Sequence, residues 1–181
     1  MGIFRKSESE PLGVSMAGVK LGQRLLAVGT REPKLIAALA AKAGLTGRAC
    51  VVDDDQERLE KGAEEIEKEG ALVEPLRAPF GTWPLDSESF DVAVIPQLLP
   101  SMDAETRTRC ISEVFRVLRP GGRAIVIESS RRGGFGALFS RGSTDPAYKG
   151  PAALLESAGF KAVRVLAETD RVVYAEGIKQ A

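Results

Sequence analysis

The sequence contains no histidine, only two cysteines and no long apolar run. Without histidine, the chain lacks the commonest general base and the commonest metal ligand. Cys50 and Cys110 have neither disulfide-framework nor metal-ligand spacing, and both fall in apolar segments. No run approaches the roughly 18 apolar residues of a membrane span. We therefore expect buried thiols, no metal, no transmembrane segment and a cytoplasmic location, with a reducing compartment implied by the unpaired cysteines.

The chain also lacks net charge, because 25 basic residues balance 25 acidic ones. A neutral protein has no overall field that would attract nucleic acid, so we expect no nucleic-acid partner. A length of 181 residues with 44% hydrophobic content is typical of one globular domain. We expect an N-terminal leader over residues 1–22 and a single domain over residues 23–181.

What the sequence does contain is a regular alternation of apolar runs and helical patterns. Strands are predicted at 24–28, 48–52, 71–76, 90–95 and 124–128, and helices at 32–43, 56–69 and 103–118. This alternation indicates βαβ crossovers and a mostly parallel sheet. After a helix at 151–158, strands at 160–167 and 171–177 are joined by too few residues for anything but a hairpin. The predicted fold is α/β: a Rossmann-like, doubly wound, seven-stranded sheet, mostly parallel, with a terminal antiparallel hairpin.

Three motifs occur in order along this pattern. They are Ser-Phe-Asp-Val-Ala-Val at 89–94, Val-Leu-Arg-Pro-Gly-Gly at 117–122, and Leu-Leu-Glu-Ser-Ala-Gly-Phe at 154–160. Together they resemble the class I S-adenosylmethionine-dependent methyltransferases, in particular the small-molecule, methyltransferase type 11-like group. The resemblance covers about residues 22–178. It implies the fold described above, with S-adenosylmethionine as cofactor.

The first turn departs from the family pattern of an acidic residue followed by Gly-x-Gly-x-Gly. Ala27 stands where the acid that receives the ammonium group belongs, and Gly29 is kept. Arg31 and Pro33 replace the other two glycines, so a side chain crowds the ligand's path and one N–H is missing. In an active version of the site, the methionine part of the cofactor would lie along Gly29 and Thr30, and Arg31 would hold its carboxylate. Arg31 at the helix N-terminus could alternatively bind another anion, such as phosphate.

The second strand ends in Asp53, which matches the family's ribose-binding acid, with Asp54 beside it. Residues 53–55 could instead serve the following helix, because Asp54 and Glu57 have capping-box spacing. After the third strand the family usually has an aspartate near the adenine amino group, whereas here residues 77–80 read Arg-Ala-Pro-Phe. Phe80 or Trp83 could flank an adenine or simply cover the core.

These departures are large enough to matter for affinity. A micromolar ligand is held by roughly 8 kcal/mol, and a hydrogen bond to a charged group contributes about 1.5–3 kcal/mol. Losing the ammonium acceptor, an adenine acceptor and close backbone approach removes about 4–6 kcal/mol on those figures. The sequence therefore predicts millimolar binding of S-adenosylmethionine unless other residues compensate.

Two further regions invite interpretation. Glu128 ends the fifth strand, where it could face the cleft or pair with Arg131 or Arg132. The stretch 131–142 interleaves glycines with Phe135, Leu138 and Phe139 between arginines; it could cover an acceptor pocket or form a contact surface. In the resembled fold, the leader lies at the same sheet edge. We therefore expect residues 1–10, including Phe4, and 131–142 to form one patch for a protein partner or a membrane surface.

Two functions follow from these residues. The first is a methyltransferase-like protein with a degraded S-adenosylmethionine site and no catalytic residue. It would act as a binding or accessory subunit of a complex, peripheral to a membrane if the patch binds there. The alternative is a divergent but active small-molecule methyltransferase. A dinucleotide-dependent reductase is disfavoured, because none of the further glycines of that fold follow Gly29.

Overall fold

The computed structural model describes residues 12–129, 147–169 and 171–181. Its strands are β1 (Arg24–Val28), β2 (Arg48–Asp53), β3 (Glu74–Arg77), β4 (Phe90–Pro96), β5 (Leu118–Ser129), β6 (Lys161–Glu168) and β7 (Val172–Ile178). Its helices are α1 (Leu12–Ala17), α2 (Pro33–Ala43), α3 (Gln56–Lys68), α4 (Ala104–Val117) and α5 (Pro151–Ser157), with a short 3-10 helix η1 (Leu99–Ser101).

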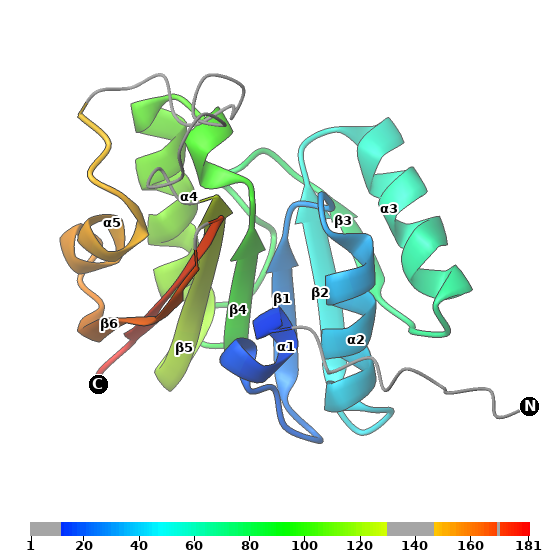
Figure 1. Cartoon of the computed structure of the whole chain (residues 1–181). Coiled ribbons are helices and arrows are strands. Elements are labelled where there is room, and N and C mark those ends of the chain that lie inside the picture. Colours follow the sequence, from blue (N-terminus) through cyan, green and yellow to red (C-terminus); the bar gives the residue numbers. More distant parts are fainter. Residues whose placement is uncertain (1–11, 130–146, 170) are drawn as a thin grey trace, which may run out of the picture.

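The strands form one seven-stranded sheet in the order β3-β2-β1-β4-β5-β7-β6 (Figure 1). The pairs from β3 through β5 are parallel, whereas β7 is antiparallel to both β5 and β6. The predicted fold class is therefore confirmed. Strand order reverses direction between β1 and β4, and in such sheets ligands bind beside the carboxyl ends of the strands at this point.

Alternate residues of the buried strands serve opposite faces of the sheet. Leu25 packs with α1 and α2 in one apolar cluster, whereas Leu26 and Val28 pack with α4 and α5 in another. In Figure 1, α1 and α2 cross in front of the sheet and α4 lies behind it. Strands buried on both faces are continuous apolar runs, and β1 and β4 have this pattern.

The two cysteines lie in this core, as predicted. Both thiols are free and buried. Burial raises the pKa of Cys50 to about 11 and that of Cys110 to about 12. At neutral pH both therefore stay protonated and unreactive.

Helix α3 begins differently from the expected capping box. The carboxylate of Asp55 caps it by accepting the backbone N–H of Arg58 at 2.7 Å. Asp54 instead pairs with the Arg58 guanidinium, also at 2.7 Å. Residues 53–55 therefore serve this helix, as the alternative expected, but the predicted capping box is wrong, because Asp55 is the N-cap and Glu57 pairs along the helix with Lys61.

Helix α1 lies within the predicted leader but packs against the sheet, where Val14, Ala17 and Val19 are buried. An ionic network holds its end. Arg123 of β5 donates hydrogen bonds to the carbonyl oxygens of Ala17 and Gly18, at 2.9 and 3.1 Å. The same guanidinium contacts Glu176 of β7 at 2.9 Å. Across the described ranges, every helix is too short or too polar to cross a bilayer.

Candidate functional site

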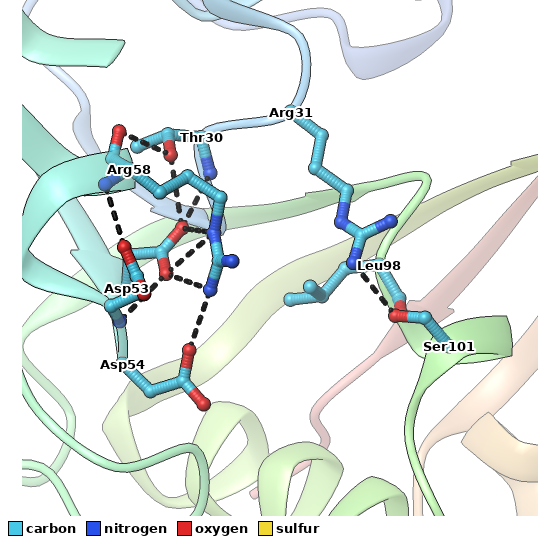
Figure 2. Close-up of polar contacts among 8 residues, drawn as sticks. Thr30, Arg31, Asp53, Asp54, Arg58, Leu98 and Ser101 are labelled. Atoms are coloured by element: carbon cyan, nitrogen blue, oxygen red, sulfur yellow. Dashed lines mark hydrogen bonds and ion pairs between the residues drawn. The ribbon is translucent and has the colours of Figure 1, made fainter. Parts of the chain in front are cut away.

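The candidate site lies where β1 and β2 end, beside the reversal of strand order. After β1, Gly29 takes a positive φ of 81° and donates its N–H to the Val52 carbonyl oxygen at 2.7 Å. A left-handed backbone of this kind is natural for glycine. The turn then carries Thr30 toward α3 and Arg31 toward the loop after β4 (Figure 2).

Asp53, the predicted ribose acid, has no exposed side-chain surface, and both of its carboxylate oxygens accept hydrogen bonds. Its Oδ2 accepts the backbone N–H of Thr30 at 3.1 Å and the Thr30 hydroxyl at 2.9 Å. Its Oδ1 accepts the N–H of Asp55 at 3.1 Å and Nη2 of Arg58 at 2.6 Å. Figure 2 shows Arg58 reaching across both Asp53 and Asp54. A ribose diol could reach this carboxylate only by displacing one of these donors.

The environment of Asp53 shifts its acidity. Burial raises the pKa of this carboxyl, but hydrogen bonds from Arg58, the Asp55 N–H and Thr30 outweigh burial and place the pKa below its ordinary value. Asp91 behaves similarly: hydrogen bonds from Arg119 and the Arg24 N–H outweigh burial and lower its pKa. Glu113 also has a lowered pKa, mainly because Arg116 hydrogen-bonds to it.

We expect the free energy of unfolding to fall as the pH is lowered through the acidic range. A carboxyl with a depressed folded-state pKa stabilises the fold fully above its unfolded pKa, which is about 4 for these groups. That contribution is lost as the pH falls through the folded-state pKa. Urea unfolding at a series of pH values between neutrality and about pH 3 measures the effect. Equal stability at both ends of the series would contradict these pKa shifts.

The other side of the turn is closed by Leu98 and Arg31. Leu98 is 2% exposed, and its Cδ2 lies 3.1 Å from where a Cβ on Gly29 would be. Arg31 spans from the β1 turn to the β4 loop and donates from Nη2 to the Ser101 hydroxyl at 2.9 Å (Figure 2). Both side chains thus bridge the two loops that flank the reversal of strand order.

Gln97, at the end of β4, has a positive φ of 54°, which is uncommon for a residue with a side chain. Its Oε1 accepts the N–H of Ser129 at 3.0 Å and the Ser129 hydroxyl at 2.9 Å. Its own N–H donates to the Ile127 carbonyl oxygen at 2.7 Å. These bonds fix the ends of β4 and β5 relative to each other. They also offset the cost of the unusual backbone.

The predicted adenine side is more open. Phe80 is half-buried and lines a pocket of about 360 Å³ with Asp54, Arg77 and Arg109. Arg77 therefore forms part of the wall of this pocket, at the position where the family resemblance places an aspartate. Trp83 is 4% exposed and packs in the core cluster behind the sheet, so it does not flank this pocket.

Glu128 is 3% exposed at the end of β5, and the Tyr148 hydroxyl donates a hydrogen bond to its Oε1. Arg107 of α4 stacks its guanidinium 4.1 Å from the centre of the Tyr148 ring. The expected pairing with Arg131 or Arg132 lies outside the described residues. The same holds for the predicted patch of Phe4, Phe135, Leu138 and Phe139, in segments 1–10 and 131–142.

The structure thus adds residues that the sequence did not suggest: Arg58, Leu98, Ser101 and Tyr148. The spacing of Asp54 and Arg58, four positions apart on a predicted helix, was the one available signal for Arg58. In the described ranges, no three His, Cys, Asp or Glu side chains converge as a metal site requires.

Residues 25–122 match the family described as "Methyltransferase domain". Because this match covers more than half of the chain and the fold agrees, the chain belongs to the class I S-adenosylmethionine-dependent methyltransferase family. Among curated relatives, it is 28% identical over 120 residues to the ubiquinone/menaquinone biosynthesis C-methyltransferase UbiE of Salmonella arizonae. That alignment covers 65% of this chain and 47% of the relative, so the chain spans about half of the relative's length.

Solved structures show the same fold at low identity. A SAM-dependent methyltransferase from Aquifex aeolicus superposes with a TM-score of 0.72 at 20% identity, covering 91% of this chain and 86% of that one. YcgJ from Bacillus subtilis gives 0.72 at 12% identity, covering 94% and 97%. The [4+2]-cyclase SpnF gives 0.69 at 16% identity, covering 94% and 79%. Neighbours with such different names illustrate that this fold does not by itself fix an activity.

Proposed function

We propose that this protein is a methyltransferase-fold subunit that acts by binding a partner and does not transfer a methyl group from S-adenosylmethionine. The observation that carries the proposal is the state of Asp53. Its carboxylate is buried and already accepts hydrogen bonds from Thr30, Asp55 and Arg58. The group that should receive the ribose hydroxyls is thereby used within the fold.

The rest of the site supports the same conclusion. Leu98 fills the space above Gly29, where the methionine part of the cofactor would pass. Ala27 provides no carboxylate for the cofactor's ammonium group. Arg77 stands where an aspartate would accept a hydrogen bond from the adenine amino group, and a guanidinium has donors only. The residues present therefore do not fit S-adenosylmethionine, and we derive no methyl-transfer step through it.

The alternative is a divergent but active methyltransferase of small molecules. Similarity to the C-methyltransferase UbiE favours it. In that version, Arg58 would swing away from Asp53 when the cofactor binds. The exposure of the Arg58 side chain, 39%, leaves room for such a movement.

Calorimetric titration with S-adenosylhomocysteine and S-adenosylmethionine separates the two functions. We expect no saturable heat up to several hundred micromolar ligand, because the lost contacts shift binding into the millimolar range. Thermal unfolding of the same sample provides the control that the protein is folded, and its midpoint should not move with either ligand. A dissociation constant in the low micromolar range would contradict the proposal and justify a search for a methyl acceptor.

A further inference from the structure

Three leucines at the amino ends of the first three strands are strongly exposed. Leu21, Leu45 and Leu72 retain 76%, 95% and 73% of their accessible surface. Leu45 and Leu72 line the same pocket of about 500 Å³, and Leu21 lies against Gly44 of that pocket's wall. Single exposed leucines are ordinary, but neighbouring ones beside a cavity are typical of interaction sites.

A second pocket, of about 490 Å³, lies on the other side of Leu72 between α3 and β3. Its apolar lining includes Leu59, Ala63, Val73 and Pro75. The two pockets share residues 71–73. Together they form one surface, which we name the α3–β3 groove, with Leu72 at its centre.

The rim of the α3–β3 groove is acidic. Glu60, Glu64 and Glu67 of α3 line the second pocket, against one cation, Arg77, and in the first pocket Arg48 is paired with Glu74 at 2.7 Å. Glu64 is 3.9 Å from Lys68, a weak contact between exposed groups. Within the ranges that the structure describes, Glu67 forms no ion pair. The groove therefore combines an apolar floor with a negative potential.

This charge restricts what can occupy the groove. A second copy of the chain bound about a two-fold axis would bring two acidic rims together, and like charges across an interface are unfavourable. An anionic bilayer or a nucleic acid would be repelled for the same reason. Addition of a strand to the free edge of β3 is also hindered, because Pro75 in the middle of that strand has no N–H.

We propose that the α3–β3 groove binds a helix of a partner protein that has leucine-like side chains on one face and lysine or arginine beside them. Such a helix would bury Leu72 and Leu45 while its cations meet Glu60, Glu64 and Glu67. This inference deepens the proposed role as a binding subunit by assigning a surface and a partner chemistry. It does not depend on whether the cofactor site is closed, because Leu45 and Leu72 lie at the amino ends of the strands, opposite to Asp53. Arg77, at the far end of the groove, is shared with the adenine-side pocket.

Fluorescence anisotropy with a synthetic amphipathic helix of leucine and lysine tests the chemistry directly. We expect this probe to bind the full chain, and the same helix with glutamate in place of lysine not to bind. Leu72→Ser and Glu64→Lys should each weaken binding about tenfold or more. Val165→Ser is the matched control, since Val165 is also exposed (49%) but lies on the opposite edge strand. Equal binding by all four proteins, or preference for the glutamate helix, would overturn the proposal.

Photo-crosslinking in the source cells tests the natural partner, with benzoylphenylalanine placed at position 72 and, as control, at position 165. The expected product at position 72 contains a basic amphipathic helix and disappears when Glu64→Lys is added. Crosslinks to a second copy of the chain, to an acidic segment, or equally from both positions would overturn the assignment. Titration of S-adenosylhomocysteine should be the same for the groove variants and the native protein, so failure here is distinguishable from failure of the proposed function.

Discussion

Asp53→Ala is expected to lower the free energy of unfolding by about 3 kcal/mol. The substitution removes the carboxylate that Arg58 contacts and leaves a cavity in its place. It also removes the acceptor of the Thr30 and Asp55 N–H groups. Breaking a buried ion pair costs about 3–5 kcal/mol, and the partial exposure of Arg58 places the effect at the lower end. The thermal midpoint should fall by about 6–12 °C for a chain of this size.

The effect of Asp53→Ala should not depend on any ligand, because the carboxylate acts within the fold. Urea unfolding with and without S-adenosylhomocysteine measures this directly. Asp86→Ala is a matched control, since Asp86 is an exposed carboxylate in a loop and its loss should change stability by less than about 0.5 kcal/mol. A double-mutant cycle with Arg58→Ala should give a coupling of about 1 kcal/mol or more. An Asp53→Ala protein as stable as the native one, but altered in cofactor binding, would return Asp53 to the ribose-binding role.

Glu176→Ala should also lower the free energy of unfolding by about 3 kcal/mol. Glu176 lies in β7, towards the opposite edge of the sheet from β3. The Glu176 side chain is 2% exposed and lies between Arg123 at 2.9 Å and Arg164 at 2.8 Å. Its loss leaves the partly buried Arg123 without an anion. Because Arg123 also binds the carbonyl oxygens of Ala17 and Gly18, α1 should loosen as well.

Hydrogen exchange distinguishes this network effect from a simple packing loss. In Glu176→Ala, amide protection should decrease in α1 as well as in β5 and β7. Glu176→Gln, which keeps an acceptor in place, should recover part of the stability. Glu65→Ala is the control at an exposed carboxylate of α3. Unchanged exchange in α1 would show that Arg123 holds this helix without help from Glu176.

The architecture was predictable because its signals are local. Apolar runs at β1, β2 and β4 and the glycine after α2 mark elements whose bounds agree with the structure within about one residue. Two bounds differ for physical reasons. Strand β3 begins at Glu74, three residues later than expected, because Gly70 and Ala71 still close the end of α3 through hydrogen bonds to Glu67 and Ile66. Strand β5 begins at Leu118, which pairs with Phe90.

The site was less predictable, because what occupies it depends on contacts between distant segments. Sequence alone placed Asp53 after β2 but could not show that Arg58 covers it or that Thr30 donates to it. Leu98 has no motif of its own, and its position above Gly29 follows from how β4 lies beside β1. Positions that a family motif identifies can therefore be named in advance, whereas the side chains that compete for them cannot.

The position of β7 has a consequence for how the chain is made. This strand lies between β5 and β6, although it follows both in sequence. During synthesis, the edge of β5 therefore stays unpaired, and β6 has no neighbour to join, until β7 leaves the ribosome. An open apolar strand edge is prone to pair with other chains. We expect the nascent protein to be most vulnerable to aggregation, and most dependent on chaperones, in the interval before its seventh strand arrives.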